Sequence, residues 1–146
     1  MSADETRIFI DSNIWLYALI HGQDSAKSAL ARELLTSADR SIFISTQVVT
    51  EVSVNLIRKT KADEPFIREL TSSFYNRYTV SQLTEQTLLL ASEVRGKHSL
   101  SFWDSLIISS ALEAGASVLY SEDMQDRLII NDVLTITNPF IKNPAL

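Results

Sequence analysis

The amino-acid sequence predicts an α/β protein: a three-layer α/β/α sandwich with a mostly parallel central sheet. Short apolar runs alternate with helical stretches of about ten residues, which is the pattern of repeated βαβ units. With 146 residues, the chain fits one domain, and we expect residues 1–146 to form it. Hydrophobic residues make up 45% of the chain and only three Gly and three Pro interrupt it, so it can bury a sizeable core.

Each predicted strand is a short run rich in apolar and β-branched residues. In chain order, the five predicted strands are residues 8–10, 41–44, 78–80, 117–120 and 134–136. Helical stretches separate the first four strands. Parallel neighbours need such crossover connections, so we expect helices on both faces of the sheet.

The predicted helices begin at residues that favour helix starts. In chain order they cover residues 12–20, 24–37, 46–57, 65–74, 84–94 and 101–113. Asp24 and Ser101 are good N-caps, and Pro65 is tolerated in a first turn. Gly115 is expected to end the last helix in the left-handed conformation. Residues 95–98, Arg-Gly-Lys-His, are expected to form a non-helical segment between the last two helices.

Composition narrows the possible functions. The net charge of −5 argues mildly against a passive nucleic-acid binder, but not against an enzyme whose bound cations invert the local field. With no Cys, the chain has no disulfide, thiolate zinc site or cysteine nucleophile. No apolar stretch approaches the roughly 20 residues that span a membrane, and residues 1–5 are unlike a secretory signal. We therefore expect a soluble cytoplasmic protein with no membrane partner.

Basic residues gather in two clusters, for which two explanations stay open. The first cluster is Arg58, Lys59 and Lys61, and the second is Arg95, Lys97 and His98. Either cluster can form a rim that faces phosphate groups. The alternative is ordinary cationic charge at helix C-termini, where it complements the helix dipole.

Four acids recur where the chain is expected to return to one edge of the sheet. Asp11 directly follows the first strand, and Glu51 lies about one turn into the helix after the second. Asp104 lies in the first turn of the helix that leads into the fourth strand, and Asp123 lies three residues after that strand. Sites in such sheets form beyond the carboxyl ends of the strands. We therefore expect all four carboxylates to face one edge.

Each acid also has a structural explanation when taken alone. Asp11 can cap the first helix, and Asp123 can be a turn residue. Asp104 stands in a pattern like a capping box that begins at Ser101, with Asp replacing the usual Glu or Gln. Glu51 can be an exposed helix residue, although its neighbour Val52 places it near an apolar face. The joint arrangement is the informative observation.

Four gathered carboxylates indicate a metal site, because like charges repel and each loses hydration when buried. Mg²⁺ and Mn²⁺ prefer such hard oxygen ligands, and bound ions of this kind activate water for attack on phosphorus. Without metal, the crowding should raise some of the carboxylate pKa values. Ser12 and Ser121 are expected to orient ligands or waters around the acids.

In four short motifs, the chain resembles the PIN-domain nucleases, and especially the VapC-type toxins of toxin–antitoxin systems. The motifs are Ile8-Phe9-Ile10-Asp11-Ser12-Asn13, Val48-Val49-Thr50-Glu51, Phe102-Trp103-Asp104-Ser105 and Leu119-Tyr120-Ser121-Glu122-Asp123-Met124. Each motif alone is unspecific, but their order and spacing fit the family over nearly the whole chain.

The resemblance implies a Mg²⁺- or Mn²⁺-dependent ribonuclease acting on RNA. The family's four acidic positions, which are both catalytic and metal-binding, fall on Asp11, Glu51, Asp104 and Asp123. Ser121 occupies the hydroxyl position before the last acid, and Ser12 and Asn13 flank the first. Glu122 and Asp126 lie close enough in sequence to assist or replace Asp123. The resemblance also implies a homodimer and a cognate antitoxin whose peptide covers the site.

Three alternative functions stay open. A phosphatase of the haloacid-dehalogenase type needs a second Asp two residues after Asp11, where Asn13 stands. Metal-independent ribonuclease chemistry needs paired histidines, and only His21 and His98 exist, both expected on the surface.

The third alternative is a non-catalytic PIN-like module that binds RNA or a protein. Phe74, Tyr75 and Tyr78 can stack on bases, but the favoured interpretation is a helix end packed onto the sheet. Trp15 and Tyr17 are expected to be core or dimer contacts. RNA binding alone would not separate this module from a nuclease, whereas metal-dependent cleavage would.

Overall fold

Six strands form one sheet in the computed structural model, which describes residues 6–20, 22, 24–38 and 41–141. The strands are β1 (Ile8–Ile10), β2 (Ile42–Ser45), β3 (Thr79–Ser81), β4 (Val118–Tyr120), β5 (Ile129–Ile130) and β6 (Leu134–Thr137). Their order in the sheet is β3-β2-β1-β4-β6-β5. Every pairing is parallel except that of β5 with β6, so the predicted mostly parallel sheet is confirmed.

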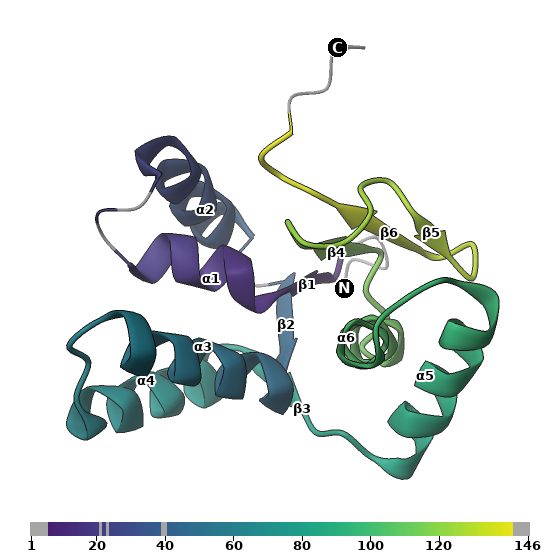
Figure 1. Ribbon diagram of the computed structural model, residues 1–146, viewed down its shortest axis with the longest axis horizontal. Helices are drawn as coiled ribbons and strands as arrows, with labels where there is room; N and C mark the ends of the chain where they lie inside the picture. Colours follow the sequence, from purple (N-terminus) through teal and green to yellow (C-terminus); the bar gives the residue numbers. More distant parts are fainter. Residues whose placement is uncertain (1–5, 21, 23, 39–40, 142–146) are drawn as a thin grey trace.

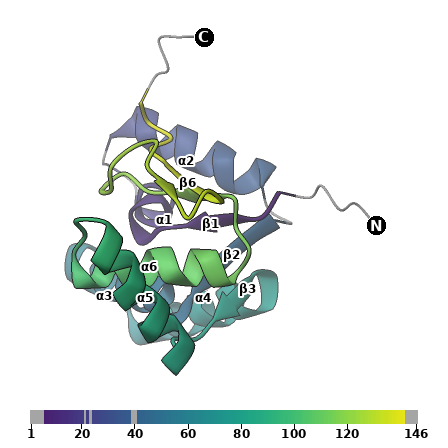
Figure 2. The same ribbon diagram turned by 90° about the vertical axis from the view of Figure 1, so that its right-hand side faces the viewer.

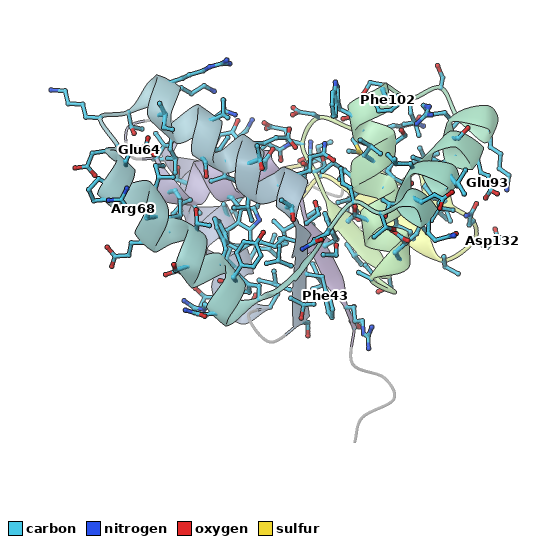
Figure 3. All side chains as sticks on the ribbon, turned by 90° about the horizontal axis from the view of Figure 1, so that it is seen from below. Phe43, Glu64, Arg68, Glu93, Phe102 and Asp132 are labelled. Atoms are coloured by element: carbon cyan, nitrogen blue, oxygen red, sulfur yellow. The ribbon has the colours of Figure 1, made fainter. Side chains whose placement is uncertain are left out.

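Within the described residues, six helices cover the two faces of this sheet. They are α1 (Ser12–Leu19), α2 (Ser25–Ser37), α3 (Thr46–Lys59), α4 (Glu64–Arg77), α5 (Glu85–Lys97) and α6 (Phe102–Glu113). Figures 1 and 2 show α2 on one side of the strands and α5 and α6 on the other. The α3–α4 and α5–α6 pairs flank the strand ends when the molecule is seen from below (Figure 3). The predicted three-layer sandwich is therefore confirmed.

The inner strands are buried on both faces. Phe9, Ile10, Ile44, Leu119 and Ile136 are fully enclosed, as expected for a parallel sheet with helices above and below. This burial explains why β1 is a continuous apolar run, whereas β6, with the sequence Leu-Thr-Ile-Thr, alternates buried apolar residues with partly exposed threonines.

The predicted helix starts are confirmed by their hydrogen bonds. The Asp24 carboxylate accepts from the Ala26 and Lys27 amides, and the Ser101 hydroxyl accepts from the Asp104 amide. At the other end of α6, Gly115 has φ +73°. A Cβ there would lie 3.4 Å from Arg7 Nη1, so both the backbone conformation and the space favour glycine.

The predicted break at residues 95–98 is wrong for its first three residues, because α5 continues through Gly96 to Lys97. The His98 amide still donates to the Val94 carbonyl, so the last turn is complete despite the glycine. Arg95 and Lys97 lie in the last turn of α5, as Arg58 and Lys59 do in α3. These positions agree with the second explanation for the basic clusters, in which cationic side chains at helix C-termini complement the helix dipole.

The short strand β5 was not among the predicted strands. It turns back onto β6 through Asn131 and Asp132, which have φ of 52° and 60°. Asn and Asp adopt positive φ more readily than other non-glycine residues, so Asn131-Asp132 was a turn signal in the sequence. His21, which was expected on the surface, lies outside the described residues. Across the part of the chain that is described, no helix is long and apolar enough to cross a membrane.

The strand order reverses direction between β1 and β4. From β1 the chain moves outward on one side through β2 to β3, and it later returns to the other side at β4. Ligand sites in open α/β sheets form at such a switch, beyond the carboxyl ends of the strands. Asp11 is the first residue after β1 and Ser121 is the first residue after β4, so both lie at this position.

Candidate active site

Asp11 lies at the switch point and is only 6% exposed. Its Oδ1 accepts a 2.8 Å hydrogen bond from the Ser12 amide, which makes Asp11 the N-cap of α1. Its Oδ2 accepts a 2.7 Å bond from the Ser121 hydroxyl, at the end of β4. The N-cap explanation is therefore correct, and it coexists with a position among the other acids.

Asn13 connects the ends of β1 and β4. Its Nδ2 donates to Asp123 Oδ2 at 3.0 Å, and its Oδ1 accepts from the Glu122 amide at 3.2 Å. The Asp123 amide in turn donates to the Ser121 hydroxyl at 3.3 Å. This network holds the loop after β4, and with it the exposed carboxylate of Asp123, against the first turn of α1.

Glu51 extends from α3 and is half-buried. Its Oε1 is enclosed and has no hydrogen-bond partner. Burial, followed by repulsion from Asp11, raises the pKa of Glu51 to about 7, although hydrogen bonding by Gln47 works in the opposite direction. A buried carboxylate oxygen without a partner is costly, so this atom is a candidate ligand for a cation.

Asp104 lies in the first turn of α6, where its amide donates to Ser101 Oγ at 3.0 Å. The capping interaction predicted at Ser101 is therefore present. Burial raises the pKa of the Asp104 carboxyl, and the charge of Asp123 raises it further.

The structure brings all four acids into mutual electrostatic contact. Burial raises the pKa of Asp11 to about 6, against the lowering effect of the Ser121 hydrogen bond, and repulsion from Asp123 and Asp104 adds to it. The negative charges of Asp11, Asp104 and Asp123 likewise raise the pKa of Glu51. The carboxylates therefore share one field, and no described cation pairs with any of the four in a salt bridge.

The donor set fits a hard divalent cation, although the acids do not form a ready-made centre. Among the described residues, no three carboxylate or imidazole side chains are close enough together to hold a metal ion. Mg²⁺ commonly takes only one or two carboxylates and keeps several waters, so a wider arrangement is compatible with it. The unpartnered oxygen of Glu51 and the raised carboxyl pKa values are both features that a bound cation would relieve.

Glu122 and Asp126 are occupied by other partners. Glu122 Oε1 accepts a 2.8 Å bond from the Tyr17 hydroxyl, and Oε2 pairs with Lys27 Nζ. Asp126 accepts from the Asn138 amide at 2.7 Å and lies 3.7 Å from the Arg127 guanidinium. Neither carboxylate is among the causes of the raised pKa values of Asp11, Glu51 and Asp104. Sequence reasoning missed Lys27, because nothing local relates α2 to the loop after β4.

Three hollows adjoin the acids. One contains Glu51 and Asp123, together with Asn55 and Lys59 from α3, and has a volume of about 330 Å³. A second, of about 220 Å³, contains Asp104, Asp123 and the half-buried His98. The third lies on the other side of Glu51 and is the largest, at about 730 Å³. The prediction that His98 is a plain surface residue is thus only partly correct.

The aromatic residues divide between the core and the surface. Phe74 and Tyr78 pack against Trp15, with ring centroids 5.0 and 5.2 Å from it, so the core interpretation is correct for these three. Tyr75 is different, because its side chain lines the largest hollow and is 47% exposed. Tyr17 is half-buried and holds Glu122, so it is not simply a core residue.

The fold and this cluster define an α/β protein with an acidic site at the switch point of a parallel sheet. A sequence model of the PIN domain matches residues 8–129, which include all four acids. The chain belongs to the PIN domain family. A comparison with curated proteins finds no match.

Solved structures of toxins share the fold. A toxin–antitoxin complex from Klebsiella pneumoniae matches with a TM-score of 0.68 at 16% identity, over 92% of this chain and 98% of that chain. VapC20 from Mycobacterium tuberculosis, a sarcin–ricin loop cleaving toxin, matches with a TM-score of 0.64 at 20% identity, over 80% and 91%. DNA-bound VapBC from Salmonella typhimurium matches with a TM-score of 0.67 at 16% identity, over 92% and 98%.

Proposed function

We propose that the chain acts as a single PIN domain that cleaves RNA with the help of Mg²⁺ or Mn²⁺. The observation that carries this proposal is the shared field of four carboxylates at the switch point, with the Glu51 oxygen left without a partner. Membership of the PIN domain family supports it, as does the fold shared with VapC20, a sarcin–ricin loop cleaving toxin. The proposed metal-binding and catalytic residues are Asp11, Glu51, Asp104 and Asp123.

The chain's own side chains have separable tasks in this proposal. When bound, a divalent cation neutralises phosphate charge and makes a water molecule more acidic. The Ser121 hydroxyl and the Ser12 amide fix both oxygens of Asp11, so this carboxylate cannot rotate freely. Asn13, in the first turn of α1, donates to Asp123 Oδ2 and so restrains that carboxylate as well. Glu51 and Asp104 complete the acidic surface from α3 and α6.

We further propose that the chain is the toxin of a toxin–antitoxin pair in the cytoplasm, and that it forms a homodimer. Several solved structures that share the fold are toxin–antitoxin or VapBC complexes, which supports an antitoxin partner. A purely structural role would not explain why the four acids lie together, because carboxylates without a cationic partner repel one another and lower the stability of the fold.

Cleavage of a mixed RNA pool by the purified chain tests the enzymatic proposal. We expect cleavage with Mg²⁺ or Mn²⁺, none with EDTA, and none by Asp104→Asn under any condition. Asp63→Asn is the matched control, because Asp63 is also a carboxylate at a helix start, the N-cap of α4, but lies outside the site. Cleavage that persists in EDTA or in Asp104→Asn would contradict the proposal. Metal-dependent RNA binding without cleavage would identify a non-catalytic module.

A further inference from the structure

The largest of the three hollows lies beside Glu51, on the side away from Asp123. Three helices and a loop enclose this groove, whose volume is about 730 Å³. Its principal lining residues are Gln47 and Glu51 of α3, Tyr75 of α4, Gln82 and Leu83 after β3, and Trp103 of α6. Because Glu51 belongs to both the groove and the acidic site, the two are continuous.

Trp103 forms one wall and is held in place although its side chain is 64% exposed. Its ring meets Phe102 edge-on, with centroids 5.6 Å apart. The Arg95 guanidinium lies over Phe102 at 4.4 Å and donates to Ser105 Oγ at 2.7 Å, which ties this aromatic pair to α5. Figure 3 shows Phe102 at one end of α6. A fixed and exposed indole contributes little to the core but offers a stacking surface.

Tyr75 is on the same groove, and its hydroxyl is anchored. The Tyr75 and Thr46 hydroxyl oxygens lie 3.4 Å apart, and Thr46 Oγ1 also donates to the Ser81 carbonyl at 3.3 Å. The neighbouring rings of Phe74 and Tyr78 are committed to Trp15 in the core. Tyr75 and Trp103 are therefore the two aromatic side chains that face this groove.

The polar groups of the groove suit an uncharged partner. Gln47 Nε2 donates to the Trp103 carbonyl at 3.3 Å, while Gln47 Oε1 is buried and has no partner. In the described part of the chain, only three buried polar side-chain atoms have no hydrogen-bond partner, and Gln47 Oε1 and Glu51 Oε1 are two of them. The described residues that line the groove include no Lys or Arg, and Glu51 repels anions. A phosphate group is therefore unsuited to the groove, whereas a flat ring with a hydrogen-bond donor on its edge fits.

We propose that the groove binds an unpaired base of the RNA, stacked on Trp103, next to the bond that the acids cleave. The proposal rests on the proposed ribonuclease function and specifies its substrate as single-stranded at this position. Glu51 itself lines the groove, and Gln47 lies about one helical turn, roughly 5.4 Å, further along α3, so the groove begins at the acids. A base inside a duplex is already paired and stacked, and it presents no free face to Trp103.

Lys59 supplies the complementary charge on the other side of Glu51. Glu51, Asn55 and Lys59 line one hollow and recur at intervals of four residues along α3. The lysine is placed to meet a backbone phosphate while the base occupies the groove. A strand crossing the acids would then contact aromatic and amide groups at one end and a cation at the other.

Binding of short fluorescein-labelled RNA, followed by anisotropy, tests this inference. The protein is the full chain carrying Asp11→Asn, so that the RNA stays intact, in buffer with Mg²⁺. Adding Trp103→Ala should weaken binding of a single-stranded oligonucleotide about five- to 100-fold, in line with the cost of losing one stacked base. Trp103→Phe should restore most of the affinity. Phe66→Ala is the matched control, since Phe66 is also an exposed aromatic residue but lies on α4 outside the groove.

Tryptophan fluorescence tests stacking directly, because RNA would not change the emission of Trp103 if this residue had only a structural role. Trp15 is buried and Trp103 exposed, so RNA that stacks in the groove should quench the accessible part of the emission. A blunt-ended duplex should bind without this quenching and should be insensitive to Trp103→Ala.

The outcomes separate this inference from the proposed function. If Trp103→Ala binds single strands as tightly as its parent, while the wild-type chain cleaves RNA, the inference is overturned and the nuclease proposal stands. The same holds if Trp103→Ala instead shifts a monomer–dimer equilibrium in sedimentation, which would assign the groove to a second copy of the chain. If the wild-type chain neither cleaves nor binds RNA, both proposals fail together.

Discussion

Ser121 donates a 2.7 Å hydrogen bond to Asp11, across 110 positions of the sequence. Both groups are buried, and the bond lowers the pKa of Asp11 against the raising effect of burial. The hydroxyl therefore helps keep the first acid ionised, and it also receives the amide of Asp123. One side chain thus connects two of the four proposed ligands.

Ser121→Ala should destabilise the fold by about 1–2 kcal/mol, because it leaves the buried Oδ2 of Asp11 with only the long 3.4 Å hydrogen bond from Asn13. Chemical denaturation measures the loss. Ser110→Ala is the matched control, since Ser110 is equally buried but its hydroxyl has no partner. We expect Ser110→Ala to be nearly neutral or stabilising. Equal losses for the two variants would mean that the bond to Asp11 contributes nothing.

Asp11→Asn should abolish cleavage and leave the metal-free fold intact or more stable at pH 8. The substitution removes one of four repelling charges, while asparagine remains a good N-cap for α1. Metal-dependent cleavage and thermal unfolding in EDTA measure the two effects. Asp24→Asn changes an exposed N-cap, that of α2, in the same way, and it should alter neither property. Cleavage by Asp11→Asn at the wild-type rate would show that the four-acid site is wrong.

Stability without metal should fall as the pH rises from about 4 to about 7. The folded pKa values of Asp11 and Glu51, about 6 and about 7, lie above the ordinary values of 3.8 and 4.5. In this window the folded state holds protons that the unfolded state has released, so raising the pH favours unfolding. Denaturation in EDTA across this range measures the slope, and Mn²⁺ should oppose the loss above pH 7. A rise in stability over the same window would contradict the raised pKa values.

Glu122→Gln should leave cleavage unchanged, whereas Glu51→Gln should abolish it. The two substitutions are chemically identical, but Glu122 is engaged by Tyr17 and Lys27 and is not among the proposed ligands. Because Lys27 and Glu122 are both partly exposed, loss of their ion pair should cost little stability. Initial rates of RNA cleavage decide the question. A large loss of activity in Glu122→Gln would show that Glu122 belongs to the active site after all.

The positions of the acids were predictable, but their contacts were not. Asp11 and Asp123 follow apolar strands, and parallel strands end at one edge, so their proximity followed from topology. The roles of Asn13 and Ser121 depend on distances between β1 and β4, which no local pattern encodes. The contacts of Glu122 with Tyr17 and Lys27 likewise form only when α1, α2 and the loop after β4 have come together.

Local rules failed where tertiary packing outweighed propensity. Gly96 was expected to break a helix, yet the buried side chain of Val94 and the bond from the His98 amide carry α5 past it. The groove at Trp103 escaped sequence reasoning for a different reason. Its walls come from α3, α4 and α6, so no contiguous segment shows its aromatic and amide groups together.

The outermost strands of the sheet constrain how two copies of this chain can associate. β3 has three residues and β5 has two, so each sheet edge offers few backbone groups for pairing. Edges this short are poor templates for extending a sheet from one molecule into the next. A dimer of this protein is therefore expected to join through side chains on its helices, and its assembly should respond to surface substitutions there while the β-sheet signal in circular dichroism stays constant.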